Sequence, residues 1–82
     1  MEKQQSTRGA ISDGLITAKI RAALATDPLT AEYAIFVETW NGVVELTGFV
    51  ETATVRAEAL QLAKYVPGVV RVQDSLELRR FD

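Results

Sequence analysis

The sequence contains no cysteine and no histidine among its 82 residues. The absence of cysteine excludes a disulfide framework, a thiolate metal site and a cysteine nucleophile. The absence of histidine removes both the usual general base and the commonest metal ligand. Catalysis would have to rely on carboxylates and hydroxyls alone, so we expect no enzymatic activity, no metal and no cofactor.

Long apolar runs are also absent. No stretch approaches the roughly 20 apolar residues that span a bilayer, and residues 1–9 lack the apolar centre of a signal peptide. We therefore expect a soluble chain, which is compatible with the mature part of an exported protein. Nine Lys and Arg residues stand against eleven Asp and Glu residues, and the basic ones are scattered. Because nucleic-acid binding depends on neutralising many phosphates, no nucleic-acid partner is expected.

The length and a hydrophobic content of 48% fit one small domain with a thin core. Residues 1–10 are polar and aperiodic and predict a flexible tail, whereas residues 11–80 are expected to form the domain. Its first element is predicted to be a helix with Ser12 or Asp13 as N-cap, ending before Pro28. The apolar stripe of this helix comprises Ile16, Ile20, Ala23 and Leu24.

Two runs rich in β-branched and aromatic residues, 34–40 and 43–50, flank Asn41 and Gly42. Asn-Gly between such runs indicates an antiparallel hairpin with a type I′ turn. The two-residue loop fixes the register, placing Trp40 opposite Val43. It also places Ile35 opposite Gly48 on the core face, where the missing side chain would let a helix approach the sheet closely.

A second helix is predicted from Thr52 to Val66, with Gly68 providing a left-handed exit. Residues 69–79 alternate between apolar and polar and predict a third strand, in which Asp74 on the apolar side indicates a bulge or a hydrogen-bonded turn. The predicted fold class is α+β in the order α-β-β-α-β, with both helices on one face of a three-stranded sheet. The sheet is antiparallel if the third strand lies beside the first, and mixed if it lies beside the second.

This order and its motifs resemble a BON domain, from about Ser12 to Leu78. The residues that carry the resemblance are Ile16 and Leu24, then Ile35 and Val37, and the hairpin pattern Asn41-Gly42-Val43-Val44-x-Leu46-x-Gly48-x-Val50. The closing pattern is Val66-x-Gly68-Val69-x-x-Val72-x-Asp74-x-Leu76, in which the family often has Asn where this chain has Asp74.

The resemblance implies a non-enzymatic module of bacterial envelopes that binds phospholipid or envelope proteins and helps maintain the membrane under osmotic stress. A periplasmic or outer-membrane-associated location is implied, with the cytoplasm as the alternative because some relatives are cytoplasmic. Many relatives carry two such domains after an export signal, whereas this sequence shows one domain and no signal.

The candidate binding surface is the sheet face opposite the predicted core. It carries Phe36, Trp40, Val43 and Phe49, which would be exposed in a monomer, so we expect a partner, a membrane or a second copy there. A protein partner or homo-oligomer is favoured over lipid on this face because Glu38 and Glu45 lie in its middle. These two glutamates face each other, and Arg71 or Arg79 is the expected counter-charge.

Candidate lipid-phosphate contacts come from the two predicted helices. Each basic residue near an anionic membrane contributes about 1 kcal/mol, so these contacts predict weak, salt-sensitive binding. The residues are Lys19, Arg21, Arg56 and Lys64.

Overall fold

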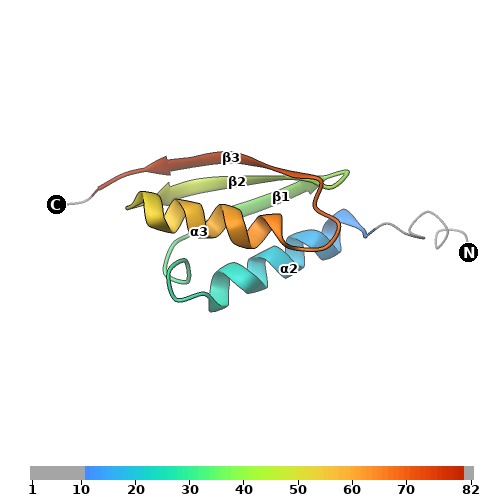
Figure 1. Ribbon diagram of the computed structural model, residues 1–82, viewed down its shortest axis with the longest axis horizontal. Coiled ribbons are helices and arrows are strands. Elements are labelled where there is room, and N and C mark those ends of the chain that lie inside the picture. Colours follow the sequence, from blue (N-terminus) through green and yellow to red (C-terminus); the bar gives the residue numbers. More distant parts are fainter. Residues whose placement is uncertain (1–10, 81–82) are drawn as a thin grey trace, which may run out of the picture.

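The computed structural model describes residues 11–80, which form two helices packed on one face of a three-stranded sheet (Figure 1). The sheet order is β1-β2-β3, with β1 antiparallel to β2 and β2 parallel to β3. The α+β fold and the order α-β-β-α-β are therefore confirmed, and the mixed sheet is the correct alternative. The predicted tail, 1–10, lies outside the described residues. The elements are α2 (Asp13–Thr26), β1 (Phe36–Trp40), β2 (Val43–Val50), α3 (Ala53–Lys64) and β3 (Arg71–Leu78).

Helix α2 begins and ends where the sequence predicts. Ser12 is the N-cap, since its hydroxyl accepts a hydrogen bond from the Leu15 N–H at 3.2 Å. The helix ends at Thr26, because Asp27 is extended and precedes a proline. Three residues of the predicted stripe are buried, namely Ile16, Ile20 and Leu24.

The hairpin between β1 and β2 has the predicted turn and register. Asn41 and Gly42 both adopt positive φ, 50° and 82°, as a type I′ turn requires. Trp40 pairs with Val43, and Glu38 pairs with Glu45. Strand β1 begins at Phe36 rather than Ala34, so the predicted pairing of Ile35 with Gly48 lies outside the ladder.

Another segment does approach Gly48 closely, but the prediction that this segment is a helix is wrong. A Cβ at this position would lie 2.6 Å from the carbonyl oxygen of Ala34, not against a helix. Gly48 also has a φ of 144°, which side-chain-bearing residues rarely adopt. The glycine therefore allows the incoming segment before β1 to cross closely over β2.

Helix α3 is capped by Thr52, whose hydroxyl accepts from the Val55 N–H at 3.1 Å, as predicted. It ends at Lys64, earlier than the predicted Val66, so Gly68 does not directly terminate it. Gly68 instead lies in the turn leading to β3, where a Cβ would meet Ile11 at 2.9 Å and Ile16 at 3.1 Å. Its role is to let this turn pack on the start of α2.

Strand β3 pairs with β2 without interruption, from Val43 with Arg71 to Val50 with Leu78. The bulge considered at Asp74 is therefore absent. The hydrogen-bonded alternative is correct, because the Asp74 carboxylate accepts the Leu76 N–H at 3.0 Å. Arg56 on α3 donates to the same carboxylate at 2.8 Å, which balances a charge on the apolar side of the strand.

The core lies between the sheet and the two helices, and its central members have no solvent exposure. These are Ile16, Ile20, Val44, Leu46, Ala59 and Ala63. Two hydrogen bonds lie at the margin of the core. The hydroxyl groups of Thr17 on α2 and Thr39 on β1 are 2.8 Å apart. The buried Thr30 hydroxyl donates to the Leu24 carbonyl at 2.7 Å. Burying these hydroxyls with partners avoids the cost of unpaired polar groups.

Candidate functional site

The outer face of the sheet, which neither helix covers, exposes large aromatic side chains. Phe36 is 66% exposed, Trp40 55% and Phe49 45%, while Val43 is half-buried. Alternation along β1 and β2 places these residues on one face with Glu38 and Glu45 between them. The structure therefore brings the predicted aromatic residues to one side of the sheet but separates them into two groups, one on each side of the glutamate pair.

The prediction that Arg71 or Arg79 balances the charge of Glu38 and Glu45 is wrong. Neither Arg71 nor Arg79 forms an ion pair with Glu38 or Glu45 in the described part of the chain. Glu45 accepts a hydrogen bond from the Ser75 hydroxyl at 2.8 Å instead. Arg79 lies over the Phe49 ring, with its guanidinium carbon 4.3 Å from the ring centroid, which is a cation–π contact.

One end of the molecule gathers the hairpin turn, the start of α2, the end of α3 and the start of β3 (Figure 1). The Asp13 carboxylate joins two of these segments, accepting the N–H of Asn41 at 2.7 Å and that of Gly42 at 2.9 Å. The Val70 N–H donates to the Gly42 carbonyl at 2.8 Å and fixes the start of β3 to the same turn. We call this region the hairpin end.

The hairpin end exposes a set of apolar and amphipathic side chains that come from four different segments. Tyr65 and Val70 are each 70% exposed, and Leu15 and Trp40 are exposed on the other two segments that meet at this end (Figure 1). Lys64 precedes Tyr65 at the end of α3, and Arg71 is the first residue of β3, next to Val43 across the strands. Sequence reasoning missed Tyr65 and Val70, because only the fold shows that their segments meet at the turn.

The family model for the BON domain matches residues 12–80 of this chain. The chain belongs to the BON family. This BON domain is 42% identical over 69 residues to osmotically-inducible protein Y of Escherichia coli (strain K12). The match covers 84% of this chain and 34% of the relative, so the chain spans about a third of the relative's length.

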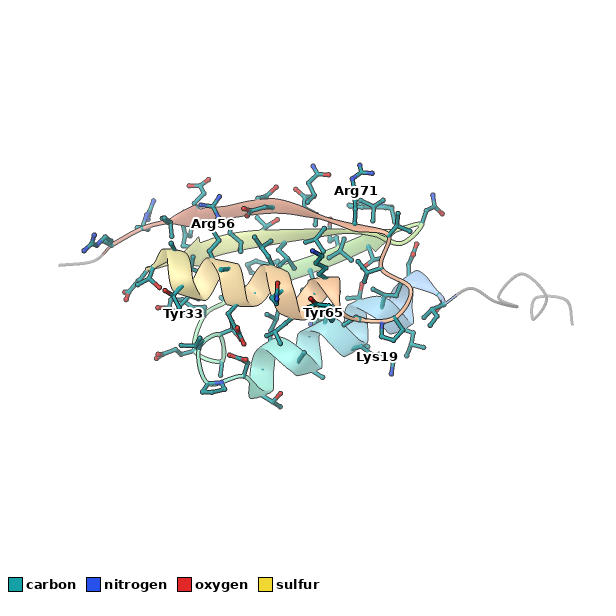
Figure 2. The ribbon with its side chains drawn as sticks, viewed as in Figure 1. Lys19, Tyr33, Arg56, Tyr65 and Arg71 are labelled. Carbon is teal, nitrogen blue, oxygen red and sulfur yellow. The ribbon has the colours of Figure 1, made fainter. Side chains whose placement is uncertain are left out.

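The four predicted lipid-phosphate contacts do not converge in this BON domain. Arg56 extends from α3 toward β3, where Asp74 engages it, whereas Lys19 projects from α2 on the other side of the view (Figure 2). Arg21 borders a small hollow with Tyr33 and Ile35, beside the segment that leads into β1. Of the four, Lys64 is the one at the hairpin end.

A pair of carboxyl groups, Asp27 and Glu58, meets where the end of α2 approaches α3. The pKa of Asp27 is lowered, chiefly by a side-chain hydrogen bond with Glu58 and further by backbone N–H groups. The pKa of Glu58 is raised, first by the same hydrogen bond, then by desolvation and by the charge of Asp27. A proton held by Glu58 thus stabilises the contact.

The described residues contain neither a cluster of metal-ligating side chains nor a membrane-spanning helix. Within 11–80, no three acidic side chains lie close enough together to hold a metal ion. No helix in this range has the length and apolar character needed to cross a bilayer.

Proposed function

We propose that this BON domain is a non-enzymatic module of the bacterial envelope that associates peripherally with phospholipid surfaces through the hairpin end. The location and the role in osmotic stress are supported by family membership and by the name of the E. coli relative, osmotically-inducible protein Y. One observation carries the choice of surface: Leu15, Trp40 and Tyr65 are exposed on segments that meet at one end of the fold (Figure 1).

The chemistry of the hairpin end suits a headgroup layer. Tryptophan and tyrosine concentrate at membrane interfaces, because each has an apolar ring with a polar tip. Lys64 and Arg71 lie beside them and could contact lipid phosphates. The Asp13 carboxylate at this end is occupied by the two backbone N–H groups of the turn. With two cations, each contributing about 1 kcal/mol near an anionic surface, association should be weak and sensitive to salt.

The test is co-flotation of the purified chain with vesicles, either containing phosphatidylglycerol or purely neutral, at low and high salt. We expect flotation with anionic vesicles at low salt, reduced by Tyr65→Ser and by Lys64→Gln. Arg21→Gln is the matched control, since Arg21 lies away from the hairpin end and should leave flotation unchanged. No flotation of the wild-type chain at low salt, or equal loss with Arg21→Gln, would contradict the proposal.

A second candidate is a protein interaction through the outer sheet face. The exposure of Phe36 and Phe49, which lie away from the hairpin end on that face, favours it. The two candidates respond to different variants: Phe36→Ser and Phe49→Ser should weaken a protein interaction without affecting vesicle flotation. Tyr65→Ser should reduce vesicle flotation without affecting a protein interaction.

A further inference from the structure

Strand β3 forms one edge of the sheet, and no other strand within residues 11–80 pairs with its outer side (Figure 1). It has eight residues, whereas β1 at the opposite edge has five. Natural edge strands are usually kept short, bent by bulges or interrupted by proline, because a long flat edge pairs with other strands. β3 has neither a proline nor a bulge, and its inward-pointing charge, Asp74, is paired with Arg56, so the edge can accept another strand.

The backbone groups of β3 show which residues face outward at the edge. Arg79 donates its N–H to the Val50 carbonyl, so the odd-numbered residues direct their backbone groups toward β2. The even-numbered residues, 72, 74, 76 and 78, direct theirs away from the sheet. In agreement, the Leu76 N–H bonds to the Asp74 side chain rather than to β2.

The helix side of this edge has unfilled apolar space. A groove of about 340 Å³ lies between α3 and β3. Its apolar lining comes from Leu60, Val69, Val70 and Val72, and Lys64, Arg71 and Asp74 add charged groups. Leu78 at the far end of the strand is 47% exposed although it points to the same side as the core. A strand added to this edge would cover the groove at the start of β3 and Leu78 at its far end.

We propose that β3 pairs with β3 of a second copy of this chain, antiparallel, about a twofold axis at Asp74. In this register Arg71 lies opposite Glu77 of the second copy, and symmetry repeats the pair. On the helix side Val70 lies opposite Leu78, so these two exposed apolar residues cover each other, and partly buried Val72 lies opposite the core residue Leu76. Cross-strand pairs of opposite charge and of apolar side chains are those that stabilise a sheet.

Charge selects this register over its neighbours. A shift by two residues in one direction places Arg71 opposite Arg79, which is a repulsive pair. A shift in the other direction places Arg71 opposite Ser75 and Val72 opposite Asp74, which pairs an apolar side chain with a carboxylate. A shift by an odd number of residues would place backbone groups that point outward from one copy opposite backbone groups that point inward on the other. Such groups could not form hydrogen bonds between the copies.

Asp74 lies opposite Asp74 of the second copy at the twofold axis, and the positive charge of Arg56 offsets the repulsion between the two carboxylates. Each Asp74 carboxylate has an Arg56 guanidinium nitrogen 2.8 Å away, so four alternating charges would lie at the axis rather than two like charges. The Leu76 N–H exchanges its bond to Asp74 for one to the Val72 carbonyl of the second copy. Each Asp74 keeps its ion pair in the dimer.

The dimer would be a six-stranded sheet with both outer faces on the same side. Pairing covers Val70 and engages Arg71 but leaves Leu15, Trp40 and Tyr65 of the hairpin end exposed. This inference does not rest on the proposed membrane role, and the two surfaces share Arg71. A single strand pairing buries less than the roughly 1,600 Å² of a standard interface, so we expect a dissociation constant of roughly micromolar to millimolar.

The test is sedimentation of the full chain without lipid, from about 10 μM to about 1 mM, a range set by the expected affinity. We expect a dimer that Arg71→Glu and Glu77→Arg each weaken about tenfold, since each reverses two cross-strand pairs. An equimolar mixture of these two variants should dimerise like the wild type, because both contacts become complementary in the heterodimer. The double variant should also regain self-association.

The mixture separates the proposed register from general charge effects. A wild-type chain that stays monomeric at the highest concentration overturns the proposal. So does a mixture in which the two single variants fail to associate while both retain their circular dichroism spectra. Trp40→Ser serves as the control for the outer face, and loss of the dimer in that variant would assign self-association to the aromatic residues instead.

Discussion

The Asp13 carboxylate accepts a hydrogen bond from the Gly42 N–H at 2.9 Å, across 29 residues of sequence. The same carboxylate accepts the Asn41 N–H at 2.7 Å, so both central amides of the hairpin turn are satisfied by one side chain from α2. Such charge-assisted contacts are stronger than neutral hydrogen bonds. Asp13 therefore couples the first helix to the hairpin and holds the hairpin end in shape.

Replacing Asp13 should destabilise the domain. We expect Asp13→Ala to lower the free energy of unfolding by about 2 kcal/mol, since two charge-assisted hydrogen bonds to backbone donors are lost. Urea unfolding followed by circular dichroism measures the change. Glu32→Ala, on an exposed turn, is the control and should change stability by less than about 0.5 kcal/mol. Equal effects of the two variants would show that the Asp13 contacts contribute little.

The contrast between Asp13 and its neighbours shows what the sequence could predict. The helix starts, the Asn41-Gly42 turn and the hairpin register follow from local signals, because capping and turn geometry involve residues close in the chain. Asp13 was a candidate N-cap from the same local reasoning. Its actual contacts lie 28 and 29 residues away, and no local pattern encodes a contact at that separation.

Gly48 and Arg79 illustrate the same limit. A glycine on the core face indicates close approach, but only the path of the chain shows that Ala34, and not a helix, approaches it. Opposite charge made Arg79 a natural partner for a glutamate, yet β3 lies beside β2 in an order that leaves the arginine over Phe49. The parallel placement of β3 also creates the hairpin end, because it brings Val70 against Gly42.

Two glycine substitutions should change stability in opposite directions. Gly48→Ala places a methyl group 2.6 Å from the Ala34 oxygen at a φ of 144°, so we expect a loss of about 2 kcal/mol or more. Gly14→Ala lies in α2 with nothing within 4 Å of the added carbon. There the higher helix propensity of alanine should stabilise the domain by about 0.5 to 1 kcal/mol. Urea unfolding of both variants makes the comparison, and a neutral Gly48→Ala would refute the close-approach argument.

The Asp27 and Glu58 pair predicts a pH-dependent effect of a single substitution. The pKa of Glu58 is raised on folding, so the folded chain binds its proton more tightly than the unfolded chain, and its ionisation at neutral pH weakens stability. Glu58→Gln should therefore stabilise the domain at pH 7. Lowering the pH through the raised pKa of Glu58 should shrink this gain, because protonated Glu58 makes the same hydrogen bond.

Unfolding measured at neutral and at mildly acidic pH tests this dependence. At still lower pH the stability of both chains should fall, because the pKa of Asp27 is lowered and its protonation breaks the contact. Glu32→Gln is the matched charge control and should show no such convergence with the wild type. A stabilisation by Glu58→Gln that is independent of pH would contradict the shared-proton interpretation.

Trp40 is the sole tryptophan of the chain and reports on the hairpin end without labelling. Because the ring is exposed, its emission should lie at long wavelength and should be quenched readily by acrylamide. Insertion of the hairpin end among lipid headgroups should shift the emission to shorter wavelength and protect it from quenching. Vesicles containing phosphatidylglycerol should produce both changes at low salt, and Tyr65→Ser should reduce them. Emission that stays unchanged while the chain floats with the vesicles would place the contact elsewhere, since Trp40 could not then be among the inserted residues.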